Sequence, residues 1–338
     1  AVGHNAGTAV TTGIQNTIVG GLAGNALTTG SNNTVVGRDA LGADTLGSRA
    51  VAIGDAALQS QNFTTATENY NVGVGYAAGA NVTTGAHNTF VGGQAGDANT
   101  TASSNTGIGK ESLTTNTTGG DNSALGRRSL NSNTTGSSNT ALGLESLYAN
   151  TTADNNTAVG TTALTANTTG ASNTAVGKDA LKANTTANNN TAVGQSALFT
   201  NTTGTENTAL GLNTLYATTT GQANTGLGSQ ALTSVTTGDN NTCAGRAAGL
   251  NLTTGSNNLF LGVDAGRTGS PGGVFTTQVN TIVLGDENIG AANIQVAFTV
   301  ASDERDKTDF VDLDLGLDFV KALEPVTYYW DKRSKYGE

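Results

Sequence analysis

The sequence holds few of the residues that usually build a compact core. Aromatic residues make up 5% and charged residues 12% of its 338 positions, beside 2 prolines, 1 cysteine and 47 glycines. One cysteine excludes a framework of internal disulfides, and no apolar run approaches the roughly 18 residues that cross a membrane. The composition therefore argues against an ordinary globular core, a disulfide-stabilised fold and insertion into a membrane.

Clusters of basic residues are also missing. The net charge of −10 divides into −6 before Ser302 and −4 from Ser302 onward, so neither part is basic. A nucleic-acid-binding face needs Lys and Arg concentrated on one surface. We therefore expect no nucleic acid among the partners.

What the sequence has instead is a repeat of 17 residues. The unit is clearest at residues 173–189, N-T-A-V-G-K-D-A-L-K-A-N-T-T-A-N-N, and its glycine recurs every 17 residues from Gly75 to Gly262. The series runs back to Gly3 with one longer step of 21 residues, and forward to Gly285 after a step of 23. A fixed period of this kind predicts a stacked repeat architecture.

Within the unit, an aliphatic residue precedes the glycine, a small residue follows three positions after it, and Leu or Gly comes next, as in Val176, Ala180 and Leu181. The N-T-T-G stretch that follows, as at 116–119, is typical of turns, because Asn and Gly tolerate positive φ. No 3.6-residue period is present. We therefore expect short strands, each with a buried aliphatic residue, in an all-β fold: a parallel β-solenoid or β-roll of 17-residue coils.

Such coils are thin. Each has about one Val, one Leu and one Ala to bury, which is little against the entropy lost on ordering 17 residues. We therefore expect the coils to need partner chains and predict a homotrimer about the rod axis, although the period itself does not count chains.

The stretch Val51–Ala57, V-A-I-G-D-A-A, resembles the head repeat of trimeric autotransporter adhesins. The resemblance covers about residues 1–285 and implies a β-roll that trimerises side by side. The 17-residue period with its N-T-T-G loop is longer than the usual adhesin coil.

Two interruptions and one boundary organise the chain. Four extra residues at 61–69 are expected to form a longer surface loop, and 267–278 should end the regular rod. We predict a repeat shaft over 1–285, an exit strand or connector over 286–301, and a separate short α+β segment over 302–338, where charge becomes dense and Gly and Asn almost vanish. Because the chain begins within a repeat, we expect it to be part of a longer protein.

The last segment opens with Ser302-Asp303-Glu304-Arg305-Asp306-Lys307. By itself this run is typical of a helix N-terminus, with Ser302 as the cap. Together with L-D-F-V-K-A-L-E-P-V-T-Y-Y-W at 317–330, however, it resembles the intramolecular chaperone domain at the C-termini of phage tailspikes and tail fibres, in which S-D-x-R-x-K marks a self-cleavage point. The family domain continues past residue 338, so 302–338 would be its N-terminal part.

The resemblance implies that Ser302 attacks the carbonyl of Ala301 and that Lys307 serves as its base. Asp303 and Arg305 would hold the motif in shape. A serine hydroxyl needs a neighbouring base, and a lysine can act as one if desolvation lowers its pKa. We expect this autoproteolysis by a Ser-Lys dyad and no activity on an external substrate.

No other constellation predicts a site, a metal or a cofactor. Cys243 stands at the small strand position and is interpreted as a buried thiol, against a reactive or interchain one. His4 and His87 are solitary and are interpreted as surface residues. The Asp residues lack the spacing of calcium-binding rolls.

The leading functional hypothesis is a structural, trimeric tail-fibre or tailspike segment of a phage, located in the virion tail or outside the cell. It would contact a host-surface receptor and other tail proteins. A bacterial cell-surface trimeric adhesin is the alternative, and an ice-binding solenoid with a regular Thr array is a third. A glycan-cutting enzyme lacks a recurring pair of carboxylates.

Overall fold

The computed structural model describes residues 1–291, and Ala1–Gly290 form one compact unit. Within these residues every regular element is a β-strand. The predicted connector from residue 292 onward and the whole segment 302–338, including its expected α+β structure, lie outside the described residues. The domain boundaries therefore stay predictions.

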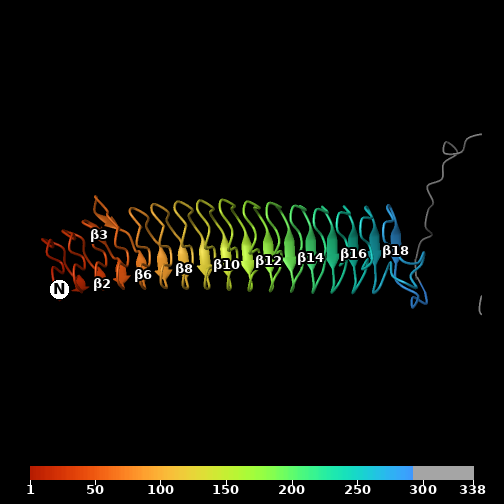
Figure 1. Ribbon diagram of the computed structural model, residues 1–338, viewed down its shortest axis with the longest axis horizontal. Coiled ribbons are helices and arrows are strands. Elements are labelled where there is room, and N and C mark those ends of the chain that lie inside the picture. The colour runs from red at the N-terminus through yellow and green to blue at the C-terminus, as the bar shows by residue number, and fades with distance from the viewer. Residues whose placement is uncertain (292–338) are drawn as a thin grey trace, which may run out of the picture. The chain divides into compact units, whose positions relative to one another are not determined.

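The unit is a stack of coils, each of which contributes one short strand to a common sheet (Figure 1). The sheet has 16 strands, all parallel, in the order β1-β2-β4 and then β6 to β18 in sequence. Its strands are β1 (Thr17–Val19), β2 (Thr34–Val36), β4 (Val51–Ile53), β6 (Val72–Val74), β7 (Thr89–Val91), β8 (Thr106–Ile108), β9 (Ser123–Leu125), β10 (Thr140–Leu142), β11 (Thr157–Val159), β12 (Thr174–Val176), β13 (Thr191–Val193), β14 (Thr208–Leu210), β15 (Thr225–Leu227), β16 (Thr242–Ala244), β17 (Leu259–Leu261) and β18 (Ile282–Leu284). The predicted all-β parallel solenoid is confirmed.

The repeat period sets the register of this sheet. Thr157 pairs with Thr174 and Ala158 with Ala175, so equivalent residues of successive coils lie side by side. The same register is kept across the longer step of the first interruption, where Val51 pairs with Val72. An insertion therefore lengthens a coil without shifting the sheet.

The interior is narrow and is filled mainly by small residues. In the coil of β12, Ala175, Ala180 and Leu181 are fully buried. The expectation that the aliphatic residue before each glycine is buried was wrong: Val176 is only half-buried, because side chains alternate along a strand and the middle residue, Ala175, points inward. The interior of a thin coil has room for a small Ala beside one buried Leu. The larger Val or Leu that precedes the glycine therefore lies on the outer face.

Each coil turns through backbone conformations that most residues avoid. Gly177 has φ of 138°, and a Cβ there would lie 2.5 Å from the carbonyl oxygen of Gly194 in the next coil, so this position requires glycine. Leu181 has φ of 50°, in the left-handed region. That conformation is costly for a leucine, and burial of its side chain offsets the cost.

Two ladders of buried asparagine run along the interior. In the first, the backbone N–H of Asn173 donates to Oδ1 of Asn156 (2.9 Å). In the second, Nδ2 of Asn184 donates to Oδ1 of Asn167 (2.7 Å) and to the carbonyl of Ala187 (3.1 Å). The interpretation of N-T-T-G as turn chemistry was therefore wrong for its Asn, which is a core residue that bonds to its counterparts.

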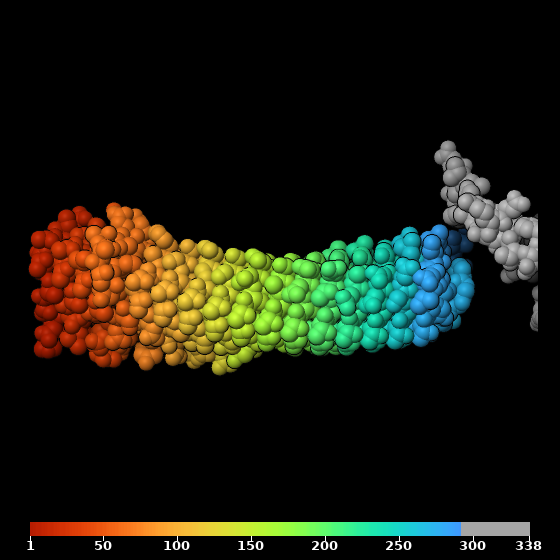
Figure 2. Space-filling view, turned by 90° about the horizontal axis from the view of Figure 1, so that it is seen from above, coloured from red at the N-terminus to blue at the C-terminus, as the bar shows by residue number. Residues whose placement is uncertain are grey.

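The first interruption widens one coil on the side away from the main sheet. Its strand β5 (Thr67–Glu68) pairs with β3 (Gly47–Ser48) of the preceding coil as a separate two-stranded sheet. Phe63 is 6% exposed and anchors the extra residues, while residues 64–66 lie at the surface. The prediction of a surface loop on an unchanged scaffold is confirmed, and the loop projects beyond its neighbours (Figure 2).

Candidate functional site

The predicted self-cleavage residues Ser302 and Lys307, the supporting Asp303 and Arg305, and the Ala301–Ser302 bond all lie outside the described residues. Their geometry stays a prediction. The surfaces of the solenoid offer three further candidates: the outer face of the main sheet, the coil edge at the first interruption, and a polar cavity beside it.

The outer face of the main sheet carries a row of aliphatic side chains that are exposed or half-buried, here called the aliphatic row. It consists of the residue before each repeat glycine, from Val19 in β1 to Leu284 in β18. The most exposed members range from 36% (Ile108) to 50% (Leu284). Those members are Val19, Ile53, Ile108, Leu125, Leu142, Val193, Leu210, Leu227, Leu261 and Leu284.

A second row runs parallel to the first, two residues earlier in each strand. It is mostly threonine, as at Thr140, Thr157 and Thr174. The hydroxyls of these three donate no hydrogen bond within residues 1–291. Neither row contains a charged residue in any strand of the sheet, so the entire outer face is uncharged.

Charged residues gather instead at the bend directly after the repeat glycine. There they pair between successive coils, as Arg38 with Asp55 (3.0 Å) and Arg128 with Glu111 (2.8 Å). The pairs are largely exposed, so each adds little to stability. They cover one edge of the coil with solvated charge and leave the sheet face uncharged.

At the first interruption, three side chains stack on consecutive coils. The guanidinium of Arg49 lies 5.7 Å from the ring centre of Tyr70, whose other neighbour is His87 at 5.6 Å. Glu68 from the inserted loop ties the stack together, because it bonds Arg49 (2.9 Å) and accepts from the Tyr70 hydroxyl (2.8 Å). The Tyr70 hydroxyl, with help from Arg49, lowers the pKa of Glu68. The stack is charge-balanced, and Arg49, Glu68 and Tyr70 bond to one another within it.

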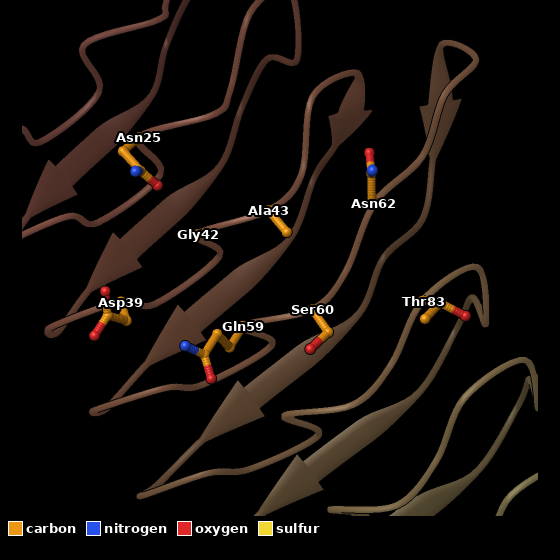
Figure 3. Close-up of a pocket in the computed structure, with 8 residues that line it drawn as sticks. All are labelled: Asn25, Asp39, Gly42, Ala43, Gln59, Ser60, Asn62 and Thr83. Atoms are coloured by element: carbon orange, nitrogen blue, oxygen red, sulfur yellow. The ribbon is translucent and has the colours of Figure 1, made fainter.

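A polar cavity of 740 Å³ lies on the neighbouring side of the same coils (Figure 3). Its lining comes from four successive coils and includes Asn25, Asp39, Gly42, Gln59 and Asn62. It is an open hollow whose walls carry amides, hydroxyls and one carboxylate. Sequence reasoning missed it, since only a comparison of side-chain size at one position of every coil would have pointed to Gly42.

The described residues hold no group of three His, Cys, Asp or Glu side chains that could bind a metal ion. Cys243 is fully buried, and burial raises the pKa of its thiol to about 12, so its interpretation as a buried, unreactive thiol is confirmed. His4 and His87 are exposed, as predicted. Within residues 1–291 no helix is long and apolar enough to span a membrane.

Comparison with known protein families gives a match at the end of the chain. Residues 302–338 match the family model of the chaperone of endosialidase. This agrees with the resemblance seen in the S-D-E-R-D-K run and the stretch that follows it. No curated protein matches the chain.

Proposed function

We propose that the chain is a segment of a homotrimeric phage tail fibre or tailspike that contacts a host surface. Its coils form the shaft, and the chaperone segment from Ser302 brings three chains together. The chaperone is then released by cleavage of the Ala301–Ser302 bond. The finished fibre belongs to the virion tail, outside the cell.

The observation that carries this proposal is the uncharged outer face of the 16-stranded sheet. Exposed apolar patches on monomeric proteins rarely extend beyond a few hundred Å², and larger ones mark interfaces. Here the aliphatic row extends from β1 to β18 without a charge, while ion pairs occupy the adjacent bend. Such a face fits burial against further copies of the same chain, whose equivalent residues stack at the same spacing.

The chaperone match supports the same proposal from the other end of the chain. A thin coil with few buried apolar groups gains from a device that holds three chains in register while they fold. Once the device is removed, refolding is no longer possible, so the assembled fibre persists because its unfolding is slow. Ser302, deprotonated by Lys307, would attack the Ala301 carbonyl and replace the peptide bond with an ester between the two residues, and water would then hydrolyse this ester and release the chaperone.

A bacterial surface adhesin would use the same shaft and the same outer face. The two functions differ in what flanks it: an adhesin should continue into a membrane anchor, and a fibre into a tail-attachment domain. The sequence of the flanking regions of the parent protein distinguishes them.

Ice binding would use the same face differently. The threonine row, with free hydroxyls at a regular spacing, is the observation that favours it. An ice-binding solenoid must leave this face open to water, whereas a fibre covers it.

Mass photometry of the chain separates these cases. We expect a stable species of three times the 33.6 kDa chain mass. A stable monomer would remove the fibre proposal, and a monomer that also produces thermal hysteresis would establish ice binding instead.

A further inference from the structure

The polar cavity exists because one position of the coil lacks a side chain. Gly42 stands five residues after its repeat glycine, where every other repeat from Gly3 to Gly262 carries a side chain, from the small Ala80 to the large Phe199 and Tyr216. The backbone does not demand glycine here: Gly42 is outside the positive-φ region. A Cβ on it would meet its nearest neighbour, the carbonyl oxygen of Asp39, at 3.2 Å. The hollow is therefore a feature of the sequence and not a by-product of the turn.

Three of the polar side chains that line the hollow are free to bind a ligand. Asn25, Gln59 and Ser60 have no side-chain hydrogen-bond partner within residues 1–291, although some of the equivalent side chains in other coils do. Asn131 at the equivalent position donates to the carbonyl of Glu111 (3.0 Å), and Thr115 donates to that of Asn131 (2.8 Å).

The cavity also adjoins the one long loop among the first coils. Asn62 lines it and begins the widened coil. Its Oδ1 accepts from the Thr45 hydroxyl (3.1 Å), while its Nδ2 has no partner within the described chain. Figure 3 shows Asn25, Asp39 and Gln59 on three successive coils beside the hollow, with Asn62 on the same coil as Gln59. Asn62 is thus the residue of the interruption that contributes to the wall of the cavity.

The chemistry of the lining indicates what it would bind. Amide groups both donate and accept hydrogen bonds, as do hydroxyls, so they match the vicinal hydroxyls of a sugar. The one carboxylate, Asp39, is paired with Arg38 at 2.7 Å, so no unpaired charge faces the ligand. The volume of 740 Å³ falls in the range of about 300–1,000 Å³ typical of small-ligand sites.

We propose that this cavity binds a neutral oligosaccharide. Its lining contains no aromatic ring for stacking, so we expect weak binding by each copy, with a Kd of about 1 mM. Three copies on one fibre would raise the effective affinity for a polymeric glycan. The biological role of this site, contact with a neutral glycan on the host, rests on the proposed function. Sugar binding itself depends only on the coils.

Saturation-transfer NMR on the chain tests it with four probes: malto-, cello-, manno- and galactotetraose. We expect transfer to at least one of them, weakened about tenfold or more in Gln59→Ala and in Gly42→Gln. The Gly42 variant fills the hollow. The control for it is Gly93→Gln, because Gly93 also lies outside the positive-φ region and has open space around it. Gln195→Ala is the control for Gln59→Ala, because both glutamines are exposed.

Three results would overturn the inference: no transfer to any of the four probes at millimolar concentration, transfer that survives both cavity variants, or binding only of an anionic hyaluronan tetrasaccharide. Gln59 is exposed and its side chain makes no internal bond, so its variant decides the matter even if Gly42→Gln misfolds. Mass photometry of the same samples keeps the two proposals apart. A trimer without sugar binding removes only this inference, and a sugar-binding monomer removes only the fibre.

Discussion

Phe90 occupies the space that a side chain on Gly96 would need: a Cβ placed on Gly96 would lie 2.4 Å from Cδ1 of Phe90. Seven coils have the opposite arrangement, with Ala in the middle of the strand and Leu at the position of Gly96, as in Ala158 and Leu164. A Cβ on Gly79, in the preceding coil, would also lie 3.0 Å from the Phe90 ring, but its nearest atom would be Cδ2 of Leu58, at 2.9 Å. Phe90 thus takes the place of the leucine that other coils carry at the position of Gly96.

This relationship predicts a rescue. Phe90→Ala should lower the free energy of unfolding by about 3–5 kcal/mol, because it leaves a cavity, and Gly96→Leu alone should also destabilise because it collides with the ring. The double variant Phe90→Ala, Gly96→Leu recreates the pair found in those coils and should recover most of the loss. Denaturant unfolding of the wild type, the two single variants and the double variant measures this, and additive losses in the double variant would contradict it.

The aliphatic row predicts how assembly can be broken. Leu125→Lys and Leu142→Lys place a charge on the outer face of β9 and β10, where each leucine is at least 40% exposed in the single chain. If the face is buried between chains, each change desolvates a charge, so the trimer should dissociate or fail to form. Sedimentation measures the change in mass.

The matched control is Thr135→Lys, since Thr135 is exposed on the loop away from the sheet. It should leave the trimer intact. Dissociation by Thr135→Lys but not by the two leucine variants would place the interface on another side of the coil.

Two buried threonines predict opposite effects of one substitution. The Thr218 hydroxyl is buried without a hydrogen-bond partner in the described chain, whereas that of Thr214 donates to the carbonyl of Gly228 at 2.6 Å. Thr218→Val should therefore raise the free energy of unfolding, by about 1 kcal/mol, and Thr214→Val should lower it by a similar amount. Thermal unfolding of the two variants compares them directly, and a loss of stability in both would mean that the Thr218 hydroxyl has a partner such as water.

The sequence predicted the parts of the fold that the period determines. The spacing of the glycines fixed where strands begin, and identical spacing made their parallel, in-register pairing predictable. It did not determine which of two adjacent residues faces inward. Ala175 and Val176 are both apolar, and the expectation favoured the larger one. The choice depends on the width of the coil, which a one-dimensional pattern does not contain.

The role of the Asn in N-T-T-G was predicted wrongly for a related reason. A single Asn beside Gly is typical of a turn, but an Asn at the same position of many coils can bond to its copies, as Asn184 does to Asn167. That possibility depends on stacking and is visible only once the register is known. The cavity was missed because it arises from an exception, Gly42, at a position that the repeat leaves variable. The self-cleavage residues were predicted from their motif and stay untested.

Asp44 is the one fully buried carboxylate within residues 1–291. Its Oδ1 accepts from the backbone N–H groups of Gly47 and Phe63, and its Oδ2 from the Gln61 amide at 2.7 Å. Burial nevertheless raises its pKa above the usual value, and these hydrogen bonds only partly offset the shift. A raised pKa in the folded state adds stability at low pH, and that contribution is lost as pH rises through the folded-state pKa.

We therefore expect the wild type to lose stability relative to Asp44→Asn as pH rises from about 3 to 7. Urea unfolding of both proteins across this range measures the difference between their free energies of unfolding. The contributions of the other carboxylates are the same in both proteins and cancel in this difference. Asp179 provides a control of opposite sign. Burial alone would raise its pKa, but hydrogen bonds from Lys182 and Thr162 outweigh burial and lower it. The wild type should gain stability relative to Asp179→Asn as pH rises. A change in the same direction for the Asp44 and Asp179 comparisons would contradict the opposite pKa shifts of the two carboxyls.

The proposed self-cleavage makes a prediction about products. The parent protein with its whole chaperone domain should yield a released fragment whose first residue is Ser302, and Ser302→Ala should abolish the release because no hydroxyl remains to attack the Ala301 carbonyl. Intact-mass measurement and N-terminal sequencing of the products test both predictions.

Lys307→Arg separates the two roles a lysine could play. Arginine keeps the positive charge but stays protonated, so it cannot take the serine proton. Loss of cleavage in both Lys307→Ala and Lys307→Arg would assign Lys307 as the base. Cleavage retained in Lys307→Arg would show instead that Lys307 contributes only its positive charge. Lys321→Ala, in the same matched segment, should cleave normally. Because the Ser302 and Lys307 substitutions affect only a step after folding, all of these variants should still form trimers. If an uncleaved trimer refolds after denaturation, cleavage of the Ala301–Ser302 bond is what makes unfolding of the fibre irreversible.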